Sequence, residues 1–553
     1  MISKEDKQLV PNMTDYEKAR RDFSLEVPEH FNFGFDIVDR WARDRTKLAF
    51  AIADEDGEII KKRTFYELKR ESNMFANVLR EQGIKKGDRV LVMLHWMPQW
   101  YIAMVGMLKL GVVPIPSTTL LTSKDIRYRL NQSEAVGVIT DSPDASKVEA
   151  ELENCPSLRT LILATGNRRG WLKWDKVMND ASTVLEDVEK TRSDDTMLLY
   201  FTSGTVSHPK MVLHTQASYA IAHRITAQFW QDLKPTDLHW TVTDTGWAKA
   251  AWGSLFGQWT MGAAVFNHYS RDKFDAKLTL RLIEDQGVTT FCAPPTAYRM
   301  FAQLPLEEYD LSSIRHCMSA GEPLNPEIIN VWEEATGTKI YDGYGQTETV
   351  NLCANFRCKP IKIGSMGLPT PGFDVRIIND RQEETEVGEE GYIAVRVKPE
   401  RPVGLFKEYW KDPEKTESVF DGDYYYTGDK AYRDKDGYFW FVGRADDVIL
   451  SAGYRIGPFE VESALVEHPA VAESAVVASP DEVRGEIVKA FVILAEDYEP
   501  SEHLVQELKD HVKKVTAPYK YPRAIEFVKT LPKTVSGKIR RGELKKKEWK
   551  EKK

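Results

Sequence analysis

A run of hydroxyl-bearing residues between positions 200 and 210 has the composition of a phosphate-binding loop. It reads Tyr-Phe-Thr-Ser-Gly-Thr-Val-Ser-His-Pro-Lys, so hydroxyl groups and a glycine lie between a short apolar run and a proline–lysine pair. Hydroxyl groups and backbone N–H groups can surround phosphate oxygens, and a lysine adds a positive charge. We therefore expect Thr202, Ser203, Gly204, Thr205 and Lys210 to bind phosphate.

This stretch is not a Walker loop, because the spacing G-x-x-x-x-G-K-[ST] is absent from it. Taken alone, it is also compatible with an ordinary serine- and threonine-rich turn between a strand and a helix. The elements around it and the motifs elsewhere in the chain must decide between the two interpretations.

Helix-like and strand-like runs alternate on both sides of this loop. Helical spacing occurs at residues 65–81, 100–110, 124–132 and 278–286, and short apolar runs occur at 90–94, 112–115, 135–140, 197–201, 263–266 and 289–292. Short apolar strands between helices are typical of parallel βαβ units that are covered on both faces. We expect an α/β fold with two βα-layered subdomains in one large N-terminal body.

The pattern changes after about residue 365. Short alternating runs such as 374–378 and 392–397, separated by glycine and proline, predict a smaller β-barrel-like subdomain. Past Gly443 a compact α+β segment follows and ends in a lysine-rich tail. The predicted domains are residues 1–444 and 445–553.

Five further motifs follow the hydroxyl-rich loop along the chain. They are Ser-Ala-Gly-Glu-Pro at 319–323, Tyr-Asp-Gly-Tyr-Gly-Gln-Thr-Glu at 341–348, Tyr-Tyr-Thr-Gly-Asp at 425–429, Gly-Arg-Ala-Asp-Asp at 443–447 and Pro-Lys-Thr-Val-Ser-Gly-Lys-Ile-Arg at 532–540. In this order the six motifs resemble those of the adenylate-forming superfamily of acyl-CoA synthetases, adenylation domains and luciferases. The resemblance covers about residues 40 to 545, and it departs from the family at Val206 and at Ser207, where the family usually has glycine.

The resemblance implies that residues 1–444 form an adenylate-forming, AMP-binding domain. Tyr344 is then expected to stack on adenine, Thr347 to contact the α-phosphate, and Asp429 to accept hydrogen bonds from the ribose hydroxyls. Glu348 is expected to hold Mg²⁺, which prefers hard oxygen ligands; without the motif it would more commonly be a helix N-terminal charge. The implied ATP- and AMP-binding residues are Thr202, Ser203, Gly204, Thr205, Lys210, Gly321, Glu322, Pro323, Asp342, Gly343, Tyr344, Gln346, Thr347, Asp429 and Arg444.

The resemblance also implies that residues 445–553 form a mobile domain that carries the catalytic Lys538. Attack of a carboxylate on the α-phosphate brings two anions together, and a lysine ammonium between them offsets the repulsion. Thr347 and Glu348 are the other implied catalytic residues, and Asp446 is the implied hinge. Most lysines near this basic tail would be solvated surface charges, and the Pro-Lys-Thr and glycine context distinguishes Lys538 from them.

Coenzyme A is the implied acceptor of the acyl group. The expected CoA-binding residues are Ser451, Ala452, Gly453, Tyr454, Arg455, Arg484 and Arg523. Gly453 would leave room for the pantetheine arm because any Cβ would narrow its path. Without the other motifs, a glycine-containing turn between a strand and a helix is the simpler interpretation of this segment.

Residues 244–259 resemble the medium-chain branch of the acyl-CoA synthetases. Gly345 stands where acetyl-CoA synthetases have a tryptophan before Gln-Thr-Glu, so an acid larger than acetate is expected. The expected acyl-pocket residues are Trp230, Trp247, Lys249, Trp252, Cys292 and Gly345. The alternatives are that the tryptophans belong to the core and that Lys249 extends its ammonium into solvent.

These residues predict an ATP-dependent acyl-CoA synthetase. Its two steps are carboxylate plus ATP to acyl-AMP and pyrophosphate, then acyl-AMP plus CoA to acyl-CoA and AMP. The acid is expected to be short- or medium-chain, or branched, and Mg²⁺ is the expected metal. The open alternatives are an adenylation enzyme that loads a carrier protein, an aryl-CoA ligase, a luciferase-like oxygenase and a non-enzymatic nucleotide sensor.

The composition restricts the partners and the compartment. The chain has 553 residues, a net charge of −9 and a pI near 5.8, which argues against a general nucleic-acid binder. Its five cysteines are scattered without a C-x-x-C pair, so disulfides and a zinc site are not expected. Neither a targeting segment nor an uninterrupted membrane-spanning apolar run is recognisable. We expect a cytoplasmic protein that does not bind membranes, with a homodimer left open.

Overall fold

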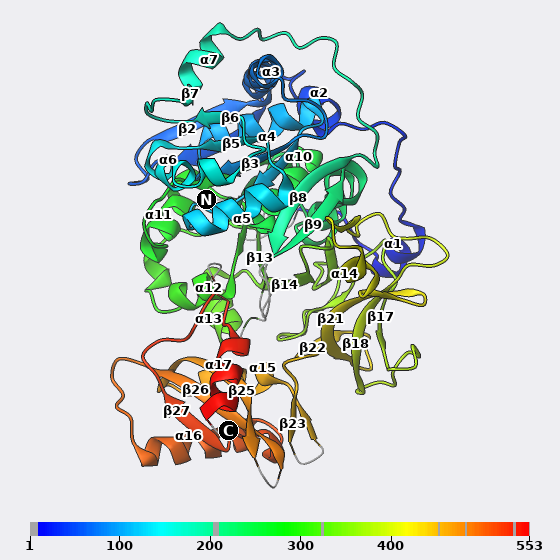
Figure 1. The fold of residues 1–553 in the computed structure, drawn as a ribbon. Helices are drawn as coiled ribbons and strands as arrows, with labels where there is room; N and C mark the ends of the chain where they lie inside the picture. Colours follow the sequence, from blue (N-terminus) through cyan, green and yellow to red (C-terminus); the bar gives the residue numbers. More distant parts are fainter. Residues whose placement is uncertain are drawn as a thin grey trace.

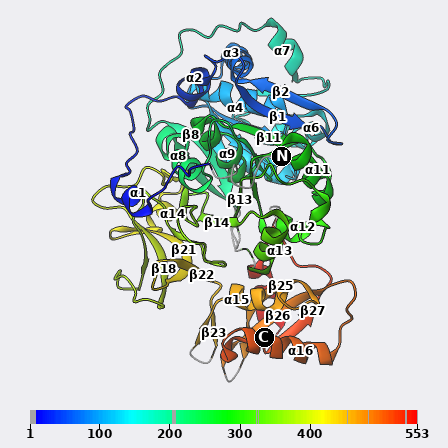
Figure 2. The same ribbon diagram turned by 180° about the vertical axis from the view of Figure 1, so that it is seen from behind.

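The computed structural model describes residues 9–202, 209–321, 324, 326–451, 454–481, 484–534 and 538–551. Figure 1 shows three parts: an α/β body in blue to green, a β subdomain in yellow, and a small domain in orange to red. The small domain lies at one end of the molecule, beside α13 (Pro326–Thr336), in this view and in the opposite one (Figure 2).

Within the described part of the chain, one sheet of the α/β body has nine strands. Their order is β16 (Leu368–Pro369), β15 (Asn351–Ala354), β14 (Ile340–Gly345), β13 (His316–Ala320), β12 (Thr290–Ala293), β10 (Leu238–Thr241), β11 (Ala264–His268), β1 (Leu48–Ala53) and β2 (Ile60–Thr64). The strands from β14 to β1 are parallel, and the pairs at both edges are antiparallel. The helices between them are α9 (Ala248–Ser254), α10 (Phe256–Met261), α11 (Ala276–Gln286), α12 (Pro295–Phe301) and α13.

A second, parallel sheet belongs to the first part of the chain. Its order is β4 (Val113–Pro116), β3 (Arg89–Met93), β5 (Gly137–Thr140), β6 (Thr160–Leu163) and β7 (Leu172–Lys173). Its helices are α3 (Phe65–Glu81), α4 (Pro98–Leu110), α5 (Ser123–Ser133), α6 (Ser142–Glu149) and α7 (Trp174–Asp180). Nearly every residue of α4 is buried, which explains why this helix is apolar on all sides.

Local signals define several of these elements. Thr64 and Glu67 form a reciprocal capping box at the start of α3, and Thr122 and Asp125 form another at the start of α5. The predicted helices and strands agree with the observed ones to within two or three residues at each end. The α/β fold predicted from the sequence is therefore confirmed.

A three-stranded antiparallel sheet carries the two ends of the hydroxyl-rich loop. It consists of β8 (Thr196–Thr202), β9 (Lys210–Thr215) and β19 (Glu408–Tyr409). Thr202 pairs with Lys210 across β8 and β9, so the segment between them joins two antiparallel strands. The element that follows the segment is a strand and not the expected helix, and the role of the segment in binding phosphate stays a prediction.

The β subdomain is an antiparallel sheet of β17 (Val375–Ile378), β18 (Glu390–Arg396), β21 (Tyr424–Arg433), β20 (Phe420–Asp421) and β22 (Phe439–Arg444), with α14 (Pro413–Glu417) nearby. The N-terminal helix α1 (Tyr16–Asp22) packs against its apolar cluster, and the Tyr16 hydroxyl donates to the carbonyl of Pro369 at 2.8 Å. This sheet carries Asp429 on β21 and Arg444 at the end of β22.

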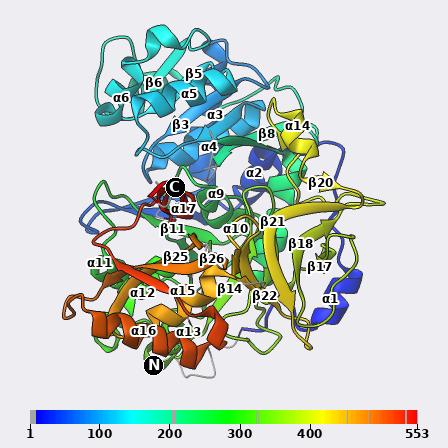
Figure 3. The same ribbon diagram turned by 60° about the horizontal axis from the view of Figure 1, so that its bottom comes forward.

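The small domain has a sheet of β24 (Tyr454–Ile456), β23 (Ile449–Ser451), β26 (Gly485–Leu494), β25 (Val471–Asp481) and β27 (Ala524–Phe527). Its helices are α15 (Pro458–Val466), α16 (Glu502–Val515) and α17 (Arg541–Glu551). Figure 3 shows α15 next to β22, where this domain meets the β subdomain. Within the described ranges, helices of sufficient length and apolarity to cross a bilayer are absent.

Candidate active site

Tyr344 and Gln346 meet Asp429 at the end of β14. The Tyr344 hydroxyl donates to Asp429 Oδ2 at 2.5 Å, and Gln346 Nε2 donates to the same oxygen at 2.8 Å. Gln346 Nε2 also donates to the carbonyl of Thr427 at 2.9 Å, and the Tyr425 hydroxyl donates to Gln346 Oε1 at 3.0 Å. Two motifs that are far apart in the sequence are thus joined by a shared carboxylate.

The Asp429 carboxylate lies in a cationic environment. Burial raises its pKa above the ordinary value, while Arg444, the hydrogen bonds from Tyr344 and Gln346, and the charge of Lys538 lower it. Arg444 Nη1 lies 3.5 Å from Asp429 Oδ1, and Arg444 Nε lies 3.7 Å from Asp446 Oδ1. Lys538 is therefore close enough to Asp429 to act on it electrostatically, although the two residues belong to different domains.

The segment that holds Lys538 is closed by backbone pairing. Lys533 and Ile539 form an isolated antiparallel bridge, and the backbone N–H of Thr534 donates to the carbonyl of Lys538 at 2.7 Å. The backbone N–H of Lys538 donates to Thr534 Oγ1 at 3.1 Å. These contacts hold residues 533–534 against residues 538–539, so the chain reverses its direction close to Lys538. The exposed lysine of the small domain can therefore be presented to the large domain.

Glu348, Tyr409 and Lys210 form a second cluster beside the first. The Tyr409 hydroxyl donates to Glu348 Oε1 at 2.8 Å, and Lys210 Nζ lies 5.1 Å from the centre of the Tyr409 ring. Burial lowers the pKa of Lys210, and the charge of Glu348 raises it. Lys210, at the end of the 200–210 motif, and Glu348, at the end of the 341–348 motif, therefore both lie next to Tyr409 of β19.

His214 holds the backbone of Thr347 in position. Its Nε2 lies 2.7 Å from the carbonyl of Thr347, and its Nδ1 lies 3.1 Å from Ser218 Oγ. Burial lowers the pKa of His214 to about 4, so the ring is neutral. Because a carbonyl only accepts, Nε2 carries the proton and Nδ1 accepts from the serine. Sequence reasoning missed His214 and Tyr409, since neither belongs to a motif.

The predicted acyl-pocket tryptophans 230 and 252 lie together. Their ring centroids are 5.8 Å apart, and Trp230 Nε1 donates to the carbonyl of Tyr341 at 3.1 Å. A Cβ added to Gly343 would lie 2.5 Å from Cε2 of Trp230, so this glycine allows the ring to approach β14. Cys292 is fully buried in the same apolar cluster, whereas Trp247 is half-buried and precedes α9.

Lys249 is directed toward the protein rather than toward solvent. Its ammonium donates to the carbonyl of Ala320 at 2.6 Å, next to Gly321 of the 319–323 motif. Burial raises the pKa of Asp342 to about 8, and the charge of Lys249 lowers it. The alternative of a solvent-directed lysine is therefore not what the structure shows.

Gly345 lies at a register shift where β14 leaves β15. A Cβ at this position would lie 2.7 Å from the carbonyl oxygen of Val350, so the local backbone already requires glycine. Its role in opening the acyl pocket stays a prediction, because this steric requirement explains the glycine without reference to the acid.

The described CoA-binding candidates lie on the small domain. Arg523 Nη1 donates to the Tyr521 hydroxyl at 2.8 Å, and the backbone N–H of Arg484 donates to Asp481 Oδ1 at 2.9 Å. Ser451 is buried at the end of β23 and pairs with Tyr454 of β24. The segment is thus an antiparallel hairpin, not a turn between a strand and a helix. In Figures 1 and 2, β23 lies at the end of the small domain away from β14.

Several predicted site residues fall outside the described ranges. They are Ser203, Gly204, Thr205, Glu322, Pro323, Ala452 and Gly453, and the side chains of Tyr454 and Arg455 are likewise not described. The flanking residues Thr202, Lys210, Gly321 and Ser451 are described and have the positions given above. The roles of all these residues remain predictions.

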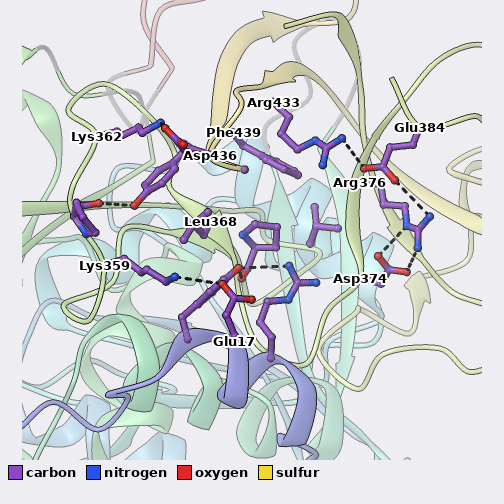
Figure 4. A pocket seen from close by; sticks show the side chains of 17 residues that line it. Glu17, Lys359, Lys362, Leu368, Asp374, Arg376, Glu384, Arg433, Asp436 and Phe439 are labelled. Carbon is purple, nitrogen blue, oxygen red and sulfur yellow. Dashed lines mark hydrogen bonds and ion pairs between the residues drawn. The ribbon is translucent and has the colours of Figure 1, made fainter. Parts of the chain in front are cut away.

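A cavity of about 650 Å³ lies elsewhere, between α1 and the β subdomain (Figure 4). Charged side chains surround it, and they pair with one another: Lys359 with Glu17 at 3.2 Å, and Arg433 with Glu384 at 3.1 Å. Among the described residues that line the cavity, none belongs to one of the six motifs. It is separate from the cluster around Asp429.

Comparison with known proteins agrees with this geometry. The model of the AMP-binding enzyme family matches residues 38–410, and that of the AMP-binding enzyme C-terminal domain matches residues 460–538. The chain belongs to the AMP-binding enzyme family. The prediction of an adenylate-forming enzyme is thereby confirmed.

The curated relatives match over nearly the full chain. The Mus musculus protein named "Acyl-coenzyme A synthetase ACSM3, mitochondrial" is 49% identical over 548 residues, which covers 97% of this chain and 94% of that protein. The Homo sapiens protein named "Acyl-coenzyme A synthetase ACSM4, mitochondrial" is 46% identical, with the same two coverages. These relatives confirm the predicted class, an AMP-forming acyl-CoA synthetase of the acid–thiol ligase type.

The same names correct one prediction. Both relatives are named as mitochondrial proteins, so the expectation of a cytoplasmic protein is wrong. That expectation depended on the absence of a recognisable targeting pattern at residues 1–23. Such a pattern is judged from composition alone, and its absence is not sufficient to assign a compartment.

Solved structures show the same fold. An anthranilate CoA ligase, AuaEII, in complex with anthranoyl-AMP has a TM-score of 0.86 and 31% identity, covering 94% of this chain and 98% of that one. An acyl-CoA synthetase from Brucella canis has a TM-score of 0.75 and 35% identity, covering 98% of this chain and 100% of that one. Both likenesses extend over the large and the small domain.

Proposed function

We propose that this enzyme activates a medium-chain or branched carboxylic acid larger than acetate and transfers it to coenzyme A. The observation that carries the proposal is the cluster around Asp429, which joins Tyr344, Gln346 and Arg444 by hydrogen bonds and an ion pair and lies within range of the charge of Lys538. Residues 1–444 would bind ATP and the acid, and residues 445–553 would turn between the two steps. A homodimer stays a prediction.

In the first step a carboxylate oxygen attacks the α-phosphorus of ATP and the bond to pyrophosphate breaks. Asp429 would accept from the ribose hydroxyls, and Tyr344 would lie against adenine, held in place by its hydrogen bond to Asp429. Lys538 would lie between the two anions and stabilise the charge that develops on the phosphorus oxygens. His214 supports this step indirectly because it fixes the backbone of Thr347.

Glu348 suits a magnesium ion that accompanies ATP. Its carboxylate accepts from the Tyr409 hydroxyl and acts electrostatically on Lys210, and a carboxylate is a hard oxygen ligand. Magnesium commonly binds through one or two carboxylates together with substrate phosphates. When bound, the ion would neutralise charge on the phosphates, and Tyr409 would keep the carboxylate oriented.

In the second step the CoA sulfur attacks the acyl carbon, and the bond to AMP breaks. Strand β23, which ends at Ser451, lies away from β14 in the observed arrangement, so the small domain would have to turn before the proposed CoA-binding segment could reach the acyl-AMP. Asp446 lies two residues after the end of β22 and is the proposed pivot. Arg484 and Arg523 are the proposed contacts for CoA phosphates.

Trp230, Trp252 and Cys292 are the proposed walls of the acyl site, with Lys249 at its polar edge. The anthranoyl-AMP bound to the anthranilate CoA ligase makes an aromatic acid the second candidate substrate. Its ring would have to fit against the same paired tryptophans.

Pyrophosphate release tests both candidates. Acetate, butyrate, 2-methylbutyrate, octanoate and benzoate are compared with and without CoA, each at saturating ATP and Mg²⁺. We expect octanoate or a branched acid to be the best substrate by kcat/KM. Acetate as the clear best substrate would contradict the proposed pocket, and benzoate as the best substrate would establish an aryl-CoA ligase instead.

A further inference from the structure

Three side chains with metal-binding atoms lie together at one edge of the second sheet. His95 follows β3, Asp141 follows β5, and Asp144 lies in the first turn of α6. One possible ligand atom from each residue lies within 4.8 Å of those of the other two. None of the three belongs to a motif of the nucleotide site.

The topology of the sheet makes this edge a natural place for a ligand. The chain runs from β3 outward to β4 and then returns to the other side of β3 as β5, so the strand order reverses between β3 and β5. Both strands are parallel and end at the same edge. In open α/β sheets ligands bind at this switch point, outside the carboxyl ends of the strands. Figures 1 and 3 show β3, β5 and α6 gathered there.

Two buried carboxylate oxygens lack hydrogen-bond partners at this edge. Asp141 is 1% exposed and Asp144 is 6% exposed. Asp141 Oδ1 and Asp144 Oδ2 receive no hydrogen bond from any described residue. An unsatisfied buried oxygen is costly, and two carboxylates this close repel each other unless a proton or a cation lies between them.

The neighbouring cations occupy the other oxygens. Arg271 donates to Asp141 Oδ2, and Lys147 Nζ lies 2.7 Å from Asp144 Oδ1. Arg271 Nη1 lies 3.6 Å from Asp144 Oδ2, beyond hydrogen-bond distance. Burial and the charge of Arg271 hold the pKa of His95 below its ordinary value, which favours the neutral, metal-binding imidazole.

We propose that His95, Asp141 and Asp144 bind a divalent first-row transition-metal ion. One imidazole and two carboxylates form a mixed nitrogen and oxygen ligand set. Such a set suits Zn²⁺ or Mn²⁺ better than Ca²⁺, which prefers oxygen ligands only. The ion would replace the missing hydrogen bonds of Asp141 Oδ1 and Asp144 Oδ2.

The position of this site indicates a structural role. The carbonyl of Leu94 accepts from Thr245 Oγ1, and Trp96 Nε1 donates to the carbonyl of Thr243 at 2.8 Å. Both neighbours of His95 therefore hold the segment that leads into α9, which carries Lys249. A bound ion would fix the end of β3, and with it this segment, to α6.

Cobalt titration of the metal-free enzyme tests the site, because Co²⁺ substitutes for Zn²⁺ and its visible spectrum distinguishes nitrogen and oxygen ligands from thiolates. The full chain is titrated without nucleotide. The variants are His95→Gln and Asp144→Asn. The controls are Glu348→Gln, which removes the proposed magnesium ligand, and His468→Gln, which alters a histidine that pairs with Glu507 in the small domain.

We expect the unaltered enzyme to bind one equivalent of Co²⁺ with a spectrum of nitrogen and oxygen ligands. Residues that only orient metal ligands contribute about tenfold or more to affinity, so loss of a direct ligand should weaken binding at least about tenfold. Both controls should bind as the unaltered enzyme does. His95 is only half-buried, so His95→Gln serves as the decisive variant if Asp144→Asn fails to fold.

Three outcomes would overturn the proposal. They are no stoichiometric binding by the unaltered enzyme, equal binding by His95→Gln, and a spectrum dominated by thiolate charge transfer. The first would mean that a shared proton alone separates the two carboxylates.

Discussion

At the scale of single residues, Asp429 connects the nucleotide motifs to the small domain. Tyr344, Gln346 and Arg444 all contact it, and Lys538 acts on its charge across the domain boundary. A residue with so many partners is sensitive to any change in charge nearby. Lys538 is the partner that can be removed without disturbing the buried hydrogen bonds.

Lys538→Ala should lower the rate of acyl-AMP formation by about 100-fold or more, the size of effect seen when a charge-stabilising donor is lost. The rate of thioester formation from supplied acyl-AMP should stay within about threefold of the unaltered enzyme. Pyrophosphate release and thioester formation measure the two steps separately. Lys533→Ala is the matched control, since Lys533 lies in the same segment but pairs with Glu473 at 2.8 Å. An equal loss in both variants would contradict the role of Lys538.

The buried Asp342 leads to a prediction about how the free energy of unfolding depends on pH. Burial raises the pKa of its carboxyl from 3.8 to about 8, so the folded protein keeps a proton that the unfolded chain loses in this range. The free energy of unfolding therefore falls as the pH rises from about 4 to about 8. Asp342→Asn removes this dependence, and its stability relative to the unaltered enzyme should rise with pH by at most about 1.4 kcal/mol per unit.

Urea unfolding at about pH 5, 6, 7 and 8 measures this difference. Asp380→Asn is the control, because it makes the same chemical change at an exposed aspartate of the β subdomain. A difference between Asp342→Asn and the unaltered enzyme that does not change with pH would show that Asp342 is already ionised in the folded protein.

At the scale of elements, β22 and α15 form the contact that sets the angle of the small domain. The rings of Phe441 and Phe459 lie 6.3 Å apart across it, and a Cβ at Gly457 would lie 2.3 Å from the carbonyl oxygen of Val442. This contact exists in the arrangement that brings Lys538 to Asp429. A domain that turns must break it.

Phe459→Ala should therefore slow acyl-AMP formation more than thioester formation, by about three- to tenfold, since an aromatic pair contributes about 0.5–1.5 kcal/mol beyond its buried area. Phe527→Ala is the matched control, because Phe527 packs on the core of the same domain away from β22. If both variants slow the two steps equally, the contact contributes to stability only and does not select an arrangement.

At the scale of the whole molecule, we predict that two faces of the small domain serve different steps. The Lys538 segment lies toward the large domain, and the β23–β24 hairpin lies away from it (Figure 1). One domain cannot present both faces to the same acyl group at once. The proposed two-step reaction therefore requires the small domain to turn between the steps.

Gly453→Leu should leave acyl-AMP formation within about threefold and reduce thioester formation from supplied acyl-AMP by about 100-fold, because a side chain there would fill the path of pantetheine. This is the reverse of the effect expected for Lys538→Ala. Retained near-ultraviolet circular dichroism establishes that the variant is folded. Loss of both steps in both folded variants would contradict the two-face arrangement.

Much of this organisation was predictable from local patterns. Helices such as α3 follow from the spacing of their apolar residues and from a capping box within a few residues. The glycine- and hydroxyl-rich motifs occur in the same order as in the adenylate-forming superfamily. The fold class, the two-part organisation and the enzyme class follow from such signals, because each depends on residues that are close in the sequence.

Contacts between distant segments were not predictable in this way. The contacts of Tyr409 with Glu348 and of His214 with Thr347, and the inward direction of Lys249, appear only when segments from separate parts of the chain pack together. The same holds for His95, Asp141 and Asp144, which the strand order brings together. Periodicity and motifs describe what each segment can form, whereas packing determines which segments meet, because burial and hydrogen bonding are satisfied by the whole chain at once.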